Sequence, residues 1–257
     1  MFTGAASGES GVQIEQYEAE ESVVINSHTG KILKTSVALS VPVGDKQDEK
    51  YVSLYRAYSG FLFDTDTVEE VNAAELPDKV LSYIRNRFAD IDAPRYQEGD
   101  STNSYEDSVD IDYVLTTAVI YNENDIFSLC KTVDTKYMAG DSIQEKYYFN
   151  YDIAHGKVID IYSLFGEENI EPLTSLLRRQ LMEQNKVHSE QQLYDMGFFN
   201  LDNMMLSGNF TFTHTGVMWV YRPLELGCYA LGNVQIELPY SELLPYTISD
   251  EIDMSKL

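Results

Sequence analysis

The chain has 257 residues, enough to bury a substantial hydrophobic core in one large domain or two small ones. Its 42 acidic and 18 basic residues give a formal net charge of -24, which argues against a nucleic-acid partner, because phosphates are neutralised by clustered Lys and Arg. No apolar run approaches the roughly 20 residues that a transmembrane helix requires.

The acidic charge has two interpretations. It steers a strongly basic protein partner towards the surface over a Debye length of about 8 Å at physiological salt. It also keeps an abundant protein soluble and monomeric without any partner. The start of the chain, residues 1–11, lacks the basic and apolar segments of a secretory signal, so we expect any signal to have been removed. This Gly- and Ser-rich segment suits a flexible tether after a lipid anchor, and equally a cloning-derived end.

The first half of the chain predicts strands followed by a helix. Three runs rich in β-prone residues, 12–26, 32–43 and 51–63, predict a meander. Pro77 suits the first position of a helix, and Asp78 favours its positive N-terminal end. Apolar residues then recur at helical spacing: Val80, Leu81, Ile84 and Phe88. We expect this helix to cover one face of the sheet.

A polar segment at 93–108 predicts an exposed connection. Further antiparallel strands are predicted at 109–115, 126–138 and 147–153. The turn at 154–157 predicts a hairpin to 158–161, because Gly156 readily takes a positive φ.

The second half predicts two helices and then strands. The first helix begins at Glu171 and carries one apolar stripe of Leu173, Leu176, Leu177 and Leu181. The second begins at Ser189, with Gln192 completing a capping box, and ends at Gly197. Strands are predicted at 210–221 and 234–238, and a short helix begins at Ser241.

Two motifs resemble the RsiV-like family, extracytoplasmic bacterial proteins with a C-terminal domain of unknown function behind a PdaC-type N-terminal domain. Residues 149–166, F-N-Y-D-I-A-H-G-K-V-I-D-I-Y-S-L-F-G, resemble the junction between those domains. The loop Y-R-P-L-E-L-G-C-Y-A-L-G at 221–232 resembles Y-x-P-Y-E-I-A-x-Y-A-x-G, with Leu224 in place of the aromatic residue. The resemblance covers about 22–247, but a family histidine is missing from Tyr-Met-Ala-Gly-Asp-Ser at 137–142.

The resemblance implies a location outside the cytoplasm, in the periplasm or at the cell surface. It also implies a PdaC-type domain at 12–152 and an RsiV-type domain at 153–250. The segregation of strands and helices predicts an α+β fold with two mainly antiparallel sheets, each packed by helices on one face. In the best-known branch of the family the domain belongs to an anti-sigma factor that binds lysozyme, so a lysozyme-like basic protein is one candidate partner and a cell-wall glycan is another.

No catalytic, cofactor or metal site is predicted. The sequence lacks G-x-S-x-G, H-E-x-x-H, a P-loop and G-x-G-x-x-G. Cys130 and Cys228 fit no zinc spacing; Cys130 is expected to be a free buried thiol, with a disulfide as the alternative. The four histidines are expected to be solvated. His28, His155 and His214 stand at predicted turns or strand ends, and His188 does not.

Four residues are candidates for ligand binding. Trp219 and Tyr221 share one face of a predicted strand, which is a binding platform if it is exposed and core if it is buried. Glu225 and Tyr229 lie in the family loop, where Glu225 can also accept backbone N–H bonds. We therefore expect a non-enzymatic envelope binding module. The alternatives are an accessory or catalytic module acting on envelope glycans, and a structural surface lipoprotein.

Overall fold

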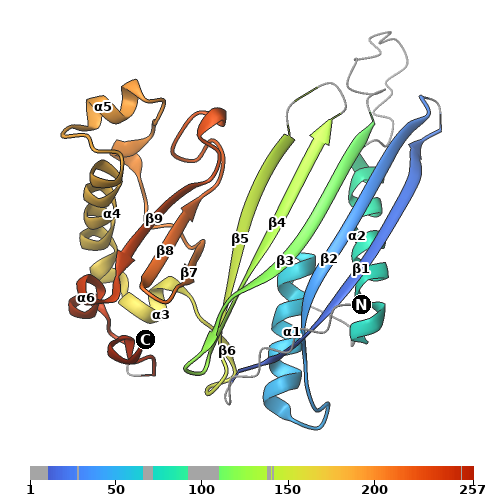
Figure 1. Ribbon diagram of the computed structural model, residues 1–257, viewed down its shortest axis with the longest axis horizontal. Coiled ribbons are helices and arrows are strands. Elements are labelled where there is room, and N and C mark those ends of the chain that lie inside the picture. Colours follow the sequence, from blue (N-terminus) through green and yellow to red (C-terminus); the bar gives the residue numbers. More distant parts are fainter. Residues whose placement is uncertain are drawn as a thin grey trace.

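The computed structural model describes residues 11–27, 29–65, 72–91, 110–137, 140, 142–249 and 251–257. It contains a six-stranded sheet and a three-stranded sheet, with helices packed on each (Figure 1). The predicted α+β class is therefore confirmed. The predicted connection at 93–108 lies outside the described residues, as do His28 and half of the segment at 137–142 where the family histidine is missing. None of the described helices has the length and apolar character needed to cross a bilayer.

The first sheet has the strand order β1-β2-β3-β4-β5-β6. Its strands are β1 (Gln13–Asn26), β2 (Lys31–Val43), β3 (Ile111–Glu123), β4 (Ile126–Tyr137), β5 (Ser142–Asp152) and β6 (Lys157–Val158). All neighbours are antiparallel except β2 and β3, which are parallel. Parallel neighbours need a long crossover, and this one contains two helices.

The predicted third strand at 51–63 is wrong, because this segment forms the helix α1 (Glu49–Phe63). The side chain of Asp48 caps the helix by accepting a hydrogen bond from Lys50 N. The buried residues Leu54, Tyr58 and Leu62 recur every four positions and form one face. The segment is therefore helical although its Tyr and Phe residues favour strands. Burial of one helical face outweighs their intrinsic preference.

The helix predicted from Pro77 is confirmed as α2 (Leu76–Ile91), preceded by a short 3-10 turn, η1 (Ala73–Glu75). Its predicted apolar residues are all buried: Val80, Leu81, Ile84 and Phe88. Together α1 and α2 cover one face of the six-stranded sheet (Figure 1). The core between them includes Leu33, Leu39, Leu115, Phe127 and Leu129.

The predicted hairpin at the end of β5 is confirmed. Tyr151 pairs with Val158, and Gly156 in the turn has a φ of 70°. The six-stranded sheet therefore continues past the domain boundary that we expected between residues 152 and 153. Ile161, which we expected to extend the second strand of the hairpin, instead begins the helix α3 (Ile161–Phe165).

The C-terminal half follows with α4 (Ile170–Gln184), α5 (Glu190–Asp195), β7 (Phe210–Phe212), β8 (Gly216–Tyr221), β9 (Val234–Pro239) and α6 (Tyr240–Leu243). The predicted single strand at 210–221 is in fact two strands, because a tight turn at 213–215 reverses the chain. The Thr213 hydroxyl accepts from the backbone N–H groups of Thr215 and Gly216 and so holds this turn. Only glycine fits at 216, since a Cβ there would lie 2.0 Å from the Leu238 carbonyl oxygen.

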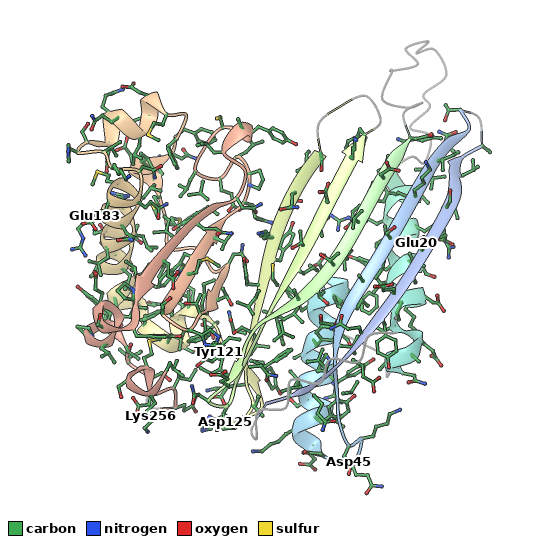
Figure 2. All side chains as sticks on the ribbon, viewed as in Figure 1. Glu20, Asp45, Tyr121, Asp125, Glu183 and Lys256 are labelled. Carbon is green, nitrogen blue, oxygen red and sulfur yellow. The ribbon has the colours of Figure 1, made fainter. Side chains whose placement is uncertain are left out.

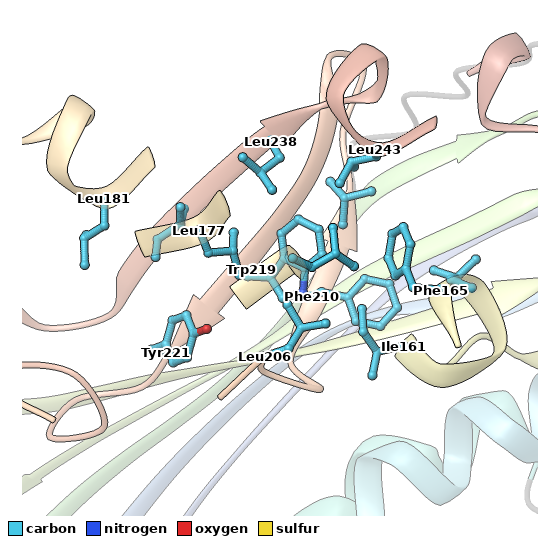
Figure 3. Close-up of a cluster of buried hydrophobic side chains, with 14 of the residues drawn as sticks. Ile161, Phe165, Leu177, Leu181, Leu206, Phe210, Trp219, Tyr221, Leu238 and Leu243 are labelled. Carbon is cyan, nitrogen blue, oxygen red and sulfur yellow. The ribbon is translucent and has the colours of Figure 1, made fainter. Parts of the chain in front are cut away.

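The predicted apolar stripe on α4 is confirmed and packs on the three-stranded sheet, order β7-β8-β9 (Figure 3). Leu173, Leu177 and Leu181 are completely buried. The helix α5 begins after Ser189 as expected, but the capping box does not form. Ser189 makes no side-chain cap, and Gln192 accepts from His188 N instead.

Candidate functional site

The six-stranded sheet has a second face, opposite α1 and α2. Side chains alternate along a strand, so Tyr17, Ala19 and Val23 of β1 contact the helical core while Glu18 and Glu20 point the other way. The register of β1 to β5 aligns these outward residues in three rows. We call them the open face: Ser22, Lys34, Asp112 and Lys136; Glu20, Ser36, Val114, Asp134 and Gln144; Glu18, Ala38, Thr116, Thr132 and Lys146.

The open face is acidic at its β1 side. Most of its central side chains are small, and Val114, its largest apolar residue, is 38% exposed. Asp112 stands in register between Lys34 and Lys136, which balance its charge. Glu18 and Glu20 have only Ala38 and Ser36 beside them on β2, so their charges have no basic neighbour in register.

The C-terminal half covers the other end of this second face. There β7 packs across the ends of β3, β4 and β5. The Asn150 side-chain amide donates to the Phe210 carbonyl at 2.7 Å and accepts from the Ser128 hydroxyl, also at 2.7 Å. Tyr121 and Ile126 belong to the same hydrophobic cluster as the C-terminal sheet. The two halves of the chain are therefore joined by a buried polar and apolar contact. Figure 1 shows the C-terminal half against one end of the six-stranded sheet.

Two asparagine side chains cover the edge of β5. Asn233 donates to the Gln144 carbonyl at 2.9 Å and accepts from Lys146 N at 3.1 Å. Asn209 donates to the Lys146 carbonyl at 2.9 Å and accepts from Tyr148 N at 2.8 Å. Each amide thus matches one acceptor and one donor of the strand, as a neighbouring strand would.

The family loop also docks on β5. The carboxylate of Glu225 accepts from the Arg222 backbone N–H at 2.7 Å and from the Arg222 guanidinium at 2.6 and 3.0 Å. The guanidinium carbon lies 5.1 Å from the centre of the Tyr147 ring, a cation–π distance. The predicted structural role of Glu225 is therefore confirmed, and Glu225 positions Arg222 against the sheet.

A buried lysine also contacts Tyr147. Lys131 Nζ donates to the Phe61 carbonyl and to Asp64 Oδ1, both at 2.9 Å, at the C-terminal end of α1. It also lies 5.1 Å from the Tyr147 ring centre. Burial lowers the pKa of Lys131, because a low-dielectric surrounding disfavours its charged form. Tyr147 therefore contacts two basic side chains, one from each half of the chain.

The predicted Trp219 and Tyr221 face is buried (Figure 3). Trp219 is 0% exposed and its ring centre lies 6.1 Å from that of Phe165. The Tyr221 hydroxyl donates to the Met205 carbonyl at 2.8 Å, and burial raises the pKa of this phenol. This face is therefore part of the hydrophobic core and is not an exposed binding platform.

Of the other two predicted ligand residues, the Glu225 side chain is 35% exposed and Tyr229 reaches the surface beside it in the same loop. Tyr229 begins the 3-10 helix η5 (Tyr229–Leu231), is 36% exposed, and donates its hydroxyl to the Ser142 carbonyl. It borders an open groove of about 360 Å³ between the β5 edge and the C-terminal loop. The groove is lined by Ser142, Gln144, Lys146, Pro223, Tyr229, Gly232, Asn233 and Gln235.

Both cysteines are free thiols, so the disulfide alternative is not realised. Cys130 is buried, as expected, and Cys228 is half-buried. His155 was expected to be a solvated turn residue, and its contact with Asp152 was not predicted. His155 Nδ1 lies 2.7 Å from the buried carboxylate of Asp152. The spacing Asp-x-x-His in a tight hairpin was the signal that could have shown this pair.

The comparisons with known proteins identify the C-terminal half. Residues 162–241 match the model of a family described as "protein of unknown function". This segment is a DUF3298 domain. It contains the whole three-stranded sheet and the loop that docks on β5. The resemblance of the first half to a PdaC-type domain stays a prediction, since the DUF3298 match does not reach it.

Two solved structures of DUF3298 family proteins share the fold. One, from Bacteroides fragilis, is 18% identical, with a TM-score of 0.80 over 96% of this chain and 99% of that chain. The other, from Pseudomonas aeruginosa, is 12% identical, with a TM-score of 0.63 over 94% of this chain and 96% of that chain. The arrangement of a DUF3298 domain behind a larger sheet therefore recurs in these proteins. No curated protein matches the chain.

Proposed function

We propose that the protein is a non-enzymatic binding module of the bacterial envelope and that it binds a basic protein through the open face. The observation that supports this proposal is the half-covered sheet. α1 and α2 cover one face, and the DUF3298 domain covers only one end of the other. A broad surface suits a protein partner, whereas small molecules bind in concave pockets.

Charge favours a basic partner over a neutral one. The chain carries a net charge of -24, and the unbalanced Glu18 and Glu20 lie on the open face itself. Complementary charge raises the association rate and suppresses wrong partners. Lysozyme is the first probe to use, because it is a basic protein of the envelope environment that the sequence resemblance implies.

The test is calorimetric titration of lysozyme into the full chain at low and at high salt. We expect saturable binding that weakens as salt is added. Glu20→Lys should weaken it by roughly tenfold, which corresponds to about 1.4 kcal/mol. Glu183→Lys is the matched control, since Glu183 lies on α4, far from the open face, and changes the net charge equally (Figure 2). Absence of binding at low salt would exclude lysozyme, and equal effects of the two variants would exclude the open face.

A second candidate function is binding of a cell-wall glycan in the groove beside Tyr229. A partly exposed tyrosine next to the amides of Gln144 and Gln235 offers a ring face and polar groups together, a combination that suits sugars. Titration with soluble peptidoglycan fragments tests it. Tyr229→Ala should abolish binding while Glu20→Lys leaves it unchanged, and the opposite pattern would exclude this groove.

A further inference from the structure

A cluster of potential metal ligands lies outside the open face and the groove. Asp152 ends β5, His155 lies in the β5–β6 turn, and Glu251 belongs to the C-terminal tail. One ligand atom from each residue lies within 4.8 Å of the other two. The fold therefore brings together a turn of the six-stranded sheet and the end of the chain, separated by almost 100 residues in sequence.

Asp152 is the anchor of this cluster. Its side chain is only 4% exposed, so this carboxylate is held almost without water. Its donors are the His155 backbone N–H at 3.0 Å and the His155 ring at 2.7 Å. A nearby positive charge stabilises a buried carboxylate. A divalent cation at this point would supply that charge.

The opposite side of the cluster is open to solvent. His155 and Glu251 are each 43% exposed, and a pocket of about 270 Å³ adjoins Asp152 and Glu251. Asp125, Asp253 and Lys256 also line this pocket, and Asp253 is paired with Lys256 at 2.8 Å. Glu251 pairs with Lys157, whose side chain is 45% exposed, and such surface pairs are weak and easily displaced. A cation therefore has an entry path and positions left for water.

The ligand chemistry favours a transition metal over calcium or magnesium. An imidazole nitrogen with carboxylate oxygens is a donor set that zinc accepts, whereas calcium and magnesium prefer oxygen alone. We propose that Asp152, His155 and Glu251 form a site for a zinc-like divalent ion, which fastens the C-terminal tail to the β5–β6 turn. This proposal is independent of the proposed function.

The first experiment titrates zinc into the metal-stripped full chain by calorimetry. We expect one saturable site, and calcium should bind at least tenfold more weakly. His155→Ala and Glu251→Gln should each weaken zinc binding at least tenfold. The matched controls are His188→Ala and Glu183→Gln, which change an exposed histidine and an exposed glutamate elsewhere and should leave binding unchanged.

The second experiment compares thermal unfolding with and without zinc. Zinc should raise the midpoint of the unmodified chain and not that of His155→Ala, because a ligand that binds only the folded state stabilises it. The midpoints without metal verify that the variants fold. Cobalt replacing zinc should give visible absorption bands that vanish in His155→Ala. Absence of a zinc site, equal binding of calcium, or zinc binding that survives both variants would overturn the proposal.

Discussion

Asn209 and Asn233 show how single side chains join the two halves of the protein. Both belong to the C-terminal half, and both side-chain amides form hydrogen bonds with the backbone of β5. Their sequence positions are 24 residues apart, yet they satisfy successive positions along one strand. No local sequence pattern predicts these hydrogen bonds, because they depend on how the DUF3298 domain is placed against the sheet.

Removing one of these amides should therefore destabilise the protein. Asn209→Ala leaves the Lys146 carbonyl and Tyr148 N–H without this partner in a half-buried place, at a cost of about 1–3 kcal/mol. Chemical denaturation measures the loss. Asn203→Ala, at an exposed asparagine, is the control and should change the free energy of unfolding by less than about 0.5 kcal/mol. Equal losses would mean that the β5 edge does not depend on Asn209.

Leu224 has a backbone conformation that is unfavourable for its residue type. It has a φ of 70° and is 59% exposed, so it occupies a left-handed conformation without burying its side chain. For residues other than glycine this conformation costs about 1–2 kcal/mol. Leu224→Gly should therefore raise the free energy of unfolding by about 1 kcal/mol. Leu224→Ala removes the same side chain but keeps the strain, and stabilisation by both variants to the same extent would contradict this explanation.

At the scale of the element, helix α1 depends on its first turn. Asp48 accepts a hydrogen bond from Lys50 N, which satisfies one of the free donors at the helix start. Asp48→Ala should lower the free energy of unfolding by about 1 kcal/mol, whereas Asp48→Asn keeps a good cap and should cost less. Denaturant titration of both variants checks the order. The reverse order would show that the charge of Asp48, not its hydrogen bond, matters.

Elements whose pattern agrees with their preference could be predicted from the sequence. In α2 the proline, the acidic first turn and the apolar spacing all point to a helix, and α2 forms as expected. In α1 the aromatic residues favour a strand while the spacing of Leu54, Tyr58 and Leu62 favours a helix, and only the packed core decides. The β7–β8 turn was missed because its residues are themselves β-prone threonines.

The candidate site was less predictable than the fold. Glu225 could be placed because its role is local, three residues from Arg222. Trp219 could not, because an alternating strand has two faces and the sequence does not say which one the DUF3298 domain buries. The open face was not predicted at all. It depends on the register of five strands and on how little of the sheet the C-terminal half covers.

At the scale of the whole molecule, buried tyrosines predict alkaline unfolding. Burial raises the pKa of Tyr55 and of Tyr113 from 10.0 to about 12, and raises that of Tyr58 further. Below pH 10 folded and unfolded chains both keep these protons, so stability is unaffected. Above pH 10 the unfolded chain releases them first, and the free energy of unfolding falls until the folded values are passed.

Denaturant titrations at increasing pH should show this loss, and phenolate absorbance should appear together with unfolding. Lys131 acts in the opposite direction, because its lowered pKa makes the folded state release a proton first as pH rises. One lysine is outweighed by several tyrosines. Full phenolate absorbance at pH 11 in a chain with native circular dichroism would contradict the prediction.

The two asparagines on β5 have a further consequence, for self-association. A sheet can grow by adding strands only where an edge offers free backbone groups. In the six-stranded sheet most of the β5 edge is taken by side chains and β6 is only two residues long, so among the described strands β1 is the long edge that remains. A sheet with one usable edge can pair with a second copy and then stops. Aggregation of this protein through the six-stranded sheet should therefore end at closed pairs instead of fibrils.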